Sequence, residues 1–145
     1  MHLTKNIVNR PLAGAVVDAI GECDHQFEEK GGVILEKYGD YRFIKLSNSH
    51  EGTVTAYGLY EADRNQFGEK VIPLMSDGWK LFSSFHTHPQ FPAVPSSLDL
   101  AKLFQGFKYN VIFSCTDKQC TISEWFGEEL KIKYIHLTTL LELSV

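Results

Sequence analysis

Apolar and polar residues alternate along the chain in patterns that predict a β-sheet with helices packed on it. From Pro11 to Cys23 apolar residues recur at helical spacing, with proline in the first turn, so we expect an amphipathic helix there. Runs of β-branched and aromatic residues, bounded by glycine, proline and polar residues, predict strands. The expected strands are Val33–Leu35, opened by Gly31 and Gly32, then Tyr41–Leu46, Thr53–Tyr60, Trp79–His88, Tyr109–Cys115, Cys120–Phe126 and Leu130–Leu137.

Turn-forming and polar residues separate these strands. Turns are expected at Gly39–Asp40 and Thr116–Gln119, polar loops at Ser47–Gly52 and Glu61–Lys70, and helices at Val71–Asp77 and Ser96–Phe107. Three prolines within residues 89–95 exclude regular structure just before the last of these helices. Helices packed on a largely antiparallel sheet give an α+β or mixed α/β fold. A length of 145 residues predicts one domain over residues 1–145.

Composition narrows the class of protein. The chain is 43% hydrophobic and 12% aromatic, enough for a substantial core. Its net charge of −4 is spread without a run of like charge, so neither nucleic acid nor an anionic membrane surface is an expected partner. We see no signal-peptide core or bilayer-spanning run, and the sparse cysteines suit a reducing compartment, so we expect a cytoplasmic protein. Cys115 and Cys120 flank a turn and could pair across it, but a reduced pair is expected there.

Candidate chemistry lies in His86-Thr87-His88, followed after seven residues by Ser96-Ser97-Leu98-Asp99. Residues two apart on a strand point the same way, so the two imidazoles project from one face, and Asp99 arrives from the first turn of a helix. Imidazole and carboxylate are zinc ligands, and three protein ligands leave the fourth position open to water, as in catalytic sites. Taken separately, the histidines could be solvent-facing, and Ser96 with Asp99 could be a helix capping box. Capping and metal binding are compatible.

This pattern resembles the signature of the JAMM (MPN+, JAB1/Mov34) zinc metalloproteases. That family also uses a glutamate in a Glu-x-x-Gly context at the first core strand, which Glu29-Lys30-Gly31-Gly32 matches. The resemblance implies a JAB/MPN sheet sandwiched by helices, with a core like that of cytidine deaminases. Taken alone, Glu29 could be a solvated charge, and its neighbour Glu28 offers another register, but the Glu-x-x-Gly spacing favours Glu29.

The resemblance also assigns roles to residues. It implies one catalytic Zn²⁺ bound by His86, His88 and Asp99, with Glu29 as general base and Ser96 stabilising the oxyanion. The implied reaction is hydrolysis of the peptide or isopeptide bond after the C-terminal glycine of ubiquitin or a ubiquitin-like protein, by deconjugation or precursor maturation.

The short chain resembles compact prokaryotic relatives, some of which accompany E1-like and E2-like proteins, including in antiphage systems. Two alternatives stay open. One is a JAMM hydrolase acting on a sulfur-carrier-protein adduct or a small peptide. The other is a non-catalytic MPN scaffold, which is weakened because scaffold members usually lose the metal ligands.

The remaining aromatic and histidine residues are expected to be structural. The core is predicted to include Phe82, Phe85, Phe91, Phe104 and Phe107. Two of the aromatic residues have a second interpretation: Phe91 could line a substrate groove, and Trp125 could contact a partner instead of packing in the core. The isolated histidines, expected at the surface or satisfied internally, are His2, His25, His50 and His136.

Overall fold

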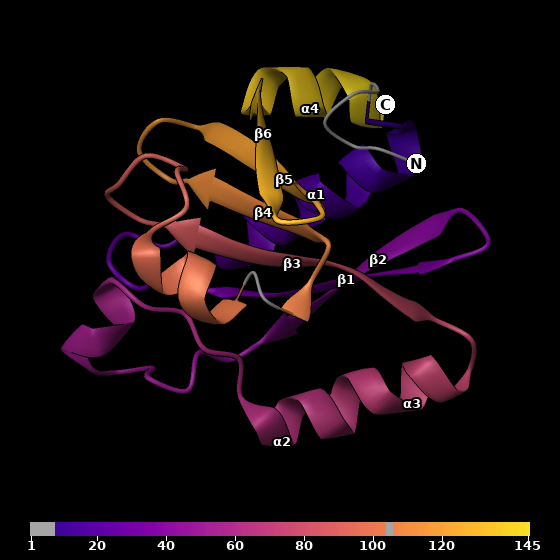
Figure 1. Ribbon diagram of the computed structural model, residues 1–145, viewed down its shortest axis with the longest axis horizontal. Helices are drawn as coiled ribbons and strands as arrows, with labels where there is room; N and C mark the ends of the chain where they lie inside the picture. The colour runs from indigo at the N-terminus through magenta and orange to yellow at the C-terminus, as the bar shows by residue number, and fades with distance from the viewer. Residues whose placement is uncertain (1–7, 104–105) are drawn as a thin grey trace.

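The protein is built on one mixed six-stranded sheet (Figure 1), seen in a computed structural model that describes residues 8–103 and 106–145. The strands are β1 (Gly31–Lys37), β2 (Asp40–Leu46), β3 (Lys80–His88), β4 (Tyr109–Ser114), β5 (Gln119–Phe126) and β6 (Glu129–His136). Their order is β2-β1-β3-β4-β5-β6. Only β3 and β4 pair in parallel, and all other neighbours are antiparallel. The predicted mixed α/β fold with a largely antiparallel sheet is confirmed.

Helices cover both faces of the sheet (Figure 1). On one face, α1 (Arg10–Cys23) and α4 (Leu137–Ser144) pack together over the main apolar cluster, which includes Ile34 and Phe85. On the other face, α2 (Arg64–Gln66), the π-helical turn η2 (Phe67–Val71) and α3 (Ile72–Ser76) cover β1 and β2. Successive strand residues point to opposite faces, so β1 sends Ile34 to one cluster and Val33 to the other. Among the described residues, no helix combines the length and apolarity needed to cross a bilayer.

Helix α1 confirms the first predicted helix. The side chain of Asn9 caps it by accepting a hydrogen bond from the Leu12 N–H at 2.9 Å, and Pro11 occupies the first turn. Apolar residues along one side, such as Val16 and Ala19, are fully buried against the sheet. All three cysteines are free and buried, as expected for a reduced protein.

The β1–β2 hairpin turns one residue earlier than predicted. Tyr38 (φ 51°) and Gly39 (φ 84°) form the turn, and Asp40 already pairs with Lys37. Two successive positive φ angles match the twist of the flanking strands. The expected Gly39–Asp40 turn is therefore corrected to Tyr38–Gly39.

Two segments differ more strongly from the prediction. Thr53–Tyr60 is not a strand: turn hydrogen bonds close the 3-10 helix η1 (Val54–Tyr57), which buries Ala56 and leaves Val54 exposed. The expected polar loop Glu61–Lys70 is helical from Arg64, because the Asp63 side chain accepts a hydrogen bond from the Gln66 N–H at 3.0 Å and starts the helix.

The end of the chain also departs from expectation. After β6, His136 caps the unpredicted helix α4, its ring accepting a hydrogen bond from the Thr138 N–H at 3.1 Å. The predicted helix Ser96–Phe107 contains the π-helical turn η3 (Asp99–Leu103), and its residues 104–105, including Phe104, lie outside the described residues.

The predicted aromatic core is largely present. Phe85 is fully buried, Phe82 and Phe107 pack against core clusters, and Trp125 packs beside Ile112. Phe91 is 57% exposed, so its core assignment is wrong. The proline-rich loop carries Phe91 away from the sheet.

Gly31 and Gly32 allow unusually close strand packing, which generates a prediction. A Cβ on Gly32 would lie 2.0 Å from the Ile44 carbonyl oxygen, and one on Gly31 would lie 2.2 Å from the Phe85 carbonyl oxygen. We expect Gly32→Ala to lower the free energy of unfolding by about 1–3 kcal/mol, because the backbone must move apart. Gly21→Ala, in α1 with open space around its added Cβ, is the control and should raise stability by up to about 1 kcal/mol. Denaturant unfolding of both variants tests this, and equal stabilities would contradict it.

Candidate metal centre

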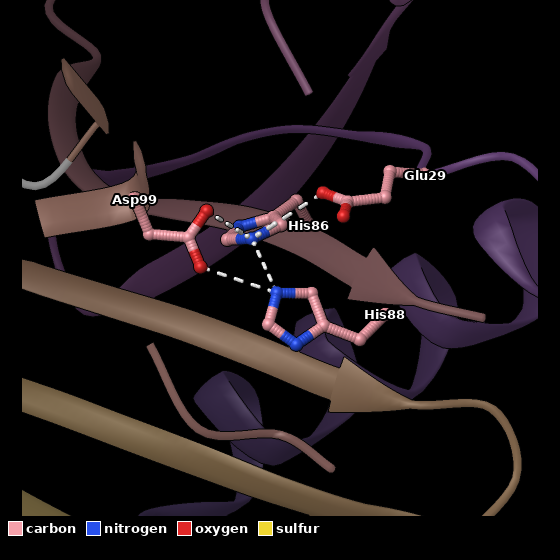
Figure 2. Close-up of side chains that lie close together, drawn as sticks. All are labelled: Glu29, His86, His88 and Asp99. Carbon is pink, nitrogen blue, oxygen red and sulfur yellow. Dashed lines mark hydrogen bonds and ion pairs between the residues drawn. The ribbon is translucent and has the colours of Figure 1, made fainter. Parts of the chain in front are cut away.

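Four buried side chains from three parts of the chain converge at one end of the sheet (Figure 2). Glu29 comes just before β1, His86 and His88 from the end of β3, and Asp99 from the start of η3. One ligand atom from each lies within 4.8 Å of all the others. All four are at most 5% exposed. The alternative interpretation, in which His86 and His88 face solvent, is therefore wrong.

Close contacts among these side chains fix their geometry. His86 Nε2 lies 3.0 Å from Asp99 Oδ1, and His88 Nε2 lies 3.1 Å from Asp99 Oδ2. The two Nε2 atoms are 3.2 Å apart. In a tetrahedral zinc site with bonds of about 2.0–2.1 Å, neighbouring ligand atoms lie about 3.3 Å apart. The separations between these three residues therefore fit a shared metal ion.

A backbone carbonyl determines the tautomer of His88. Its Nδ1 lies 2.8 Å from the carbonyl oxygen of Pro92, which can only accept, so Nδ1 carries a proton and donates it. Nε2 then faces Asp99 with its lone pair when the ring is neutral. This arrangement, in which the non-ligating nitrogen donates to a carbonyl, is the usual one for a metal-binding histidine. The proline-rich loop thus prepares His88 as a ligand.

Asp99 belongs to the predicted capping box as well as to the cluster. Its N–H donates to Ser96 Oγ at 3.1 Å, and its Oδ2 accepts a hydrogen bond from the Ser96 N–H at 2.9 Å. These reciprocal bonds orient the carboxylate toward the two imidazoles. Ser96 Oγ accepts the capping bond, so its hydroxyl proton stays available to donate elsewhere. Capping and ligand geometry therefore coexist, as the sequence suggested.

Glu29 is positioned by backbone contacts on both sides. The next residue, Lys30, donates its N–H to Thr87 Oγ1 at 3.1 Å and accepts the Thr87 N–H at 2.9 Å. The Glu29 N–H donates to the Ala56 carbonyl at 2.7 Å. Its carbonyl accepts a hydrogen bond from the Asn48 side chain at 3.0 Å. This frame places Glu29 Oε1 3.8 Å from His86 Nε2.

Glu28 is excluded from the cluster. Its Oε1 accepts a hydrogen bond from the Gly52 N–H at 3.2 Å, outside the group of four. The expected choice of Glu29 over Glu28 therefore agrees with the geometry. Two buried atoms of the cluster, Glu29 Oε1 and His86 Nδ1, have no hydrogen-bond partner among the described residues. For Glu29 Oε1, which lies 3.8 Å from His86 Nε2, a cation bound among the four side chains would compensate the cost of this burial.

Burial and mutual contact shift the pKa values of the cluster in different directions. Burial raises the pKa of Glu29 to about 8 and lowers the pKa of His86, which favours the neutral form of the ring. Burial alone would raise the pKa of Asp99, but hydrogen bonds from His86 and His88 hold it well below its ordinary value. For His88 burial is outweighed by its bonds to Asp99 and the Pro92 carbonyl, which raise its pKa. Positive charge at the centre would favour the ionised form of Glu29.

A cleft of about 460 Å³ gives access to the centre. Glu29, His88 and Ser96 line it, together with apolar side chains of the proline-rich loop. A substrate in the cleft can therefore reach Glu29, the predicted base, and Ser96, the predicted hydrogen-bond donor. His88, one of the predicted metal ligands, lines the same cleft.

The sequence predicted all five residues that meet here but missed their supports. Asn48 is 5% exposed and holds the segment around Glu29, yet a single asparagine in a polar loop carries no pattern that reveals this. Tyr60 stacks on His86 with ring centroids 6.1 Å apart. The sequence does not predict this contact, because it places Tyr60 in a strand, Thr53–Tyr60, that does not form. The hydrogen bond from His88 to the Pro92 carbonyl uses a backbone group, so the residue types in the sequence do not predict it.

The fold and the centre together define a JAB-type protein with a candidate metal site. Residues 17–126 match the model of a family described as prokaryotic homologs of the JAB domain, so the chain belongs to that family, which includes metalloproteases. No curated protein sequence matches the chain significantly. The solution structure of protein DSY2949 from Desulfitobacterium hafniense is similar, with 18% identity, coverage of 82% of this chain and 85% of that one, and a TM-score of 0.64. At that identity the likeness supports the fold alone.

Metal binding should stabilise the folded protein. We expect zinc at a hundred times its dissociation constant to add about 2.7 kcal/mol, which raises Tm by roughly 5–10 °C for a chain of this size. A chelator should reverse the shift. His88→Ala should abolish it, whereas His50→Ala, whose ring pairs with Glu61 outside the cluster, should keep it. Thermal unfolding with and without zinc measures this, and an equal shift in both variants would place the metal elsewhere.

Asn48 should be a major contributor to local stability. Its side chain donates to the carbonyls of Glu29 (3.0 Å) and Leu59 (2.8 Å), and accepts the N–H groups of His50 and Glu61. Asn48→Ala leaves these groups without partners, so we expect a loss of about 1–3 kcal/mol in unfolding free energy. The exposed Asn65→Ala in α2 is the matched control and should change stability little. Chemical denaturation compares the two variants. An unchanged unfolding free energy in Asn48→Ala would contradict the proposed contribution of Asn48 to stability.

Proposed function

We propose that the protein is a zinc-dependent hydrolase of the JAMM type, in which His86, His88 and Asp99 bind the metal. The observation that carries this proposal is the separation of 3.0–3.2 Å between their ligand atoms, with Glu29 beside them. Two imidazoles and one carboxylate are a ligand set that zinc favours. Zinc bound there supplies Lewis acidity, which lowers the pKa of water to about 7.

The other residues have roles that follow from their chemistry. Glu29 lines the cleft, and its buried Oε1 has no hydrogen-bond partner among the described residues, so the carboxylate can accept a proton as general base and pass it to the leaving amine. Ser96 lines the same cleft with an available hydroxyl proton, which suits donation to the oxyanion of a tetrahedral intermediate. The chain needs no covalent intermediate for this reaction.

For the substrate, we propose the amide bond after the C-terminal glycine of a ubiquitin-like protein. Support comes from membership of the prokaryotic JAB family and from the motif resemblance, so this step rests on analogy. On this basis the partners are the ubiquitin-like tail and E1-like or E2-like proteins, with a place in modifier maturation or antiphage defence. Three free cysteines support a reducing compartment such as the cytoplasm.

Other functions give different expectations. A sulfur-carrier adduct or a small peptide would use the same centre with a different occupant of the cleft. A scaffold has no need for four buried, converging side chains with ligand geometry, so the cluster favours an enzyme over a scaffold.

The base and donor assignments can be tested with paired variants. We expect Glu29→Gln to retain zinc but lose hydrolysis, and Ser96→Ala to lower kcat about 10²–10³-fold. The neighbouring Glu28→Gln and the exposed Ser97→Ala are controls that should keep activity.

The assay uses a ubiquitin-like protein of the same genome fused ahead of a reporter, with mass spectrometry locating the cut. Elemental analysis reports zinc in every variant. Cleavage by Glu29→Gln at the normal rate would disprove the base assignment. Zinc loading without any cleavage of the fusion would disprove the proposed substrate.

A further inference from the structure

A second pocket adjoins the cleft of the metal centre. It has a volume of about 430 Å³ and is lined by Phe27, Tyr57, Gly58, Gln90 and Phe91. Gly58 and Phe91 line both this pocket and the cleft that contains Glu29 and His88. The two hollows are therefore adjacent, and Gly58 and Phe91 lie at their junction. A chain whose amide group is held at the centre can extend into the second pocket.

The pocket has the chemistry of a site for an apolar side chain. Phe27, Tyr57 and Phe91 are 47%, 47% and 57% exposed, and the rings of Phe27 and Tyr57 lie 6.1 Å apart. None of the described residues that line it is charged. Three half-exposed aromatic rings around one hollow are unusual on a protein surface and mark a recognition site.

The walls of the pocket are attached to the same backbone that builds the centre. Phe27 lies two residues before Glu29, and its N–H donates to the ring of His25 at 3.1 Å. Tyr57 follows Ala56, whose carbonyl accepts the Glu29 N–H at 2.7 Å. The Gln90 side chain donates to the Gln26 carbonyl at 3.2 Å and ties the two loops together. The pocket is therefore preorganised at a fixed position relative to the centre.

We propose that this aromatic pocket is a specificity subsite for a large apolar side chain on the acyl part of the substrate, a few residues before the bond that is cut. This inference rests on the proposed function, because the metal centre anchors the substrate. Gly58 at the junction leaves room for the substrate backbone, since a Cβ added there would contact nothing within 4 Å. The subsite selects apolar over charged residues because a charged side chain would lose water there without gaining a partner.

The test uses peptide hydroxamates, whose hydroxamate group chelates zinc and fixes the register. Calorimetry with the zinc-loaded protein compares acetohydroxamate with acetyl peptides that end in glycine hydroxamate. These peptides carry Phe, Leu, Gly, Glu or Lys one, two or three residues before the end. At one register, Phe and Leu should bind about tenfold tighter than Gly, which corresponds to about 1.4 kcal/mol. Glu and Lys should gain nothing.

Variants of the lining residues test whether the tighter binding of Phe and Leu peptides depends on the aromatic pocket. Phe27→Ala and Tyr57→Ala should reduce the tenfold preference while the affinity for acetohydroxamate stays unchanged. Gly58→Leu, which places a side chain in open space at the junction, should abolish the preference without unfolding the protein. Val54→Ala is the control: Val54 is 77% exposed on the same 3-10 helix as Tyr57 but lines neither hollow.

The outcomes separate the subsite from the metal centre. Binding of acetohydroxamate with no apolar preference at any register overturns the subsite and leaves the proposed hydrolase intact. A preference that persists in both Tyr57→Ala and Gly58→Leu also overturns it. Failure of acetohydroxamate to bind overturns the metal centre and the subsite together.

Discussion

The hydrogen bond between His88 and the Pro92 carbonyl is the constraint on which the centre depends. Because Nδ1 must donate to that carbonyl, the lone pair of a neutral His88 points at Asp99 Oδ2 from 3.1 Å. Two acceptors at that distance repel each other unless a cation lies between them. A proton on His88 can fill this role, and the raised pKa of its ring reflects this. A divalent ion bound there would also do so, and it would compensate the charge of Glu29 at the same time.

The parallel pairing of β3 and β4 explains how Asp99 reaches the histidines. A parallel pair requires a crossover that leaves the end of one strand and returns to the start of the next. Here the described part of that crossover, residues 89–103, brings Asp99 to His86 and His88. The capping bonds between Asp99 and Ser96 then orient the carboxylate toward the two imidazoles. Topology and local capping cooperate to complete the ligand set.

The sequence predicted what depends on local pattern and failed where contacts between distant segments decide. Helix α1 followed from its helical periodicity and first-turn proline, and the strands carrying His86 and Tyr109 followed from runs of β-branched and aromatic residues. Thr53–Tyr60 has the β-branched composition of a strand, but its polar groups form local turns and its buried Ala56 binds Glu29, so it becomes a 3-10 helix. The side chains of β3 do not alternate strictly between the two faces, because the register shifts opposite Ile34 and Leu35 and Phe82 packs in the same cluster as Phe85.

The glycine pair at the start of β1 connects the fold to the chemistry. A side chain on Gly31 would reach the Phe85 carbonyl and the Cα of His86, so only glycine lets β1 approach β3 closely there. That approach brings Lys30 against Thr87, and Lys30 then sets the position of Glu29 beside His86. Glycine at position 31, just before the glycine of the Glu-x-x-Gly pattern, is therefore a packing requirement: it allows the short distance between β1 and β3 that places Glu29 beside His86. A larger residue at this point would weaken the fold and displace the base in the same step.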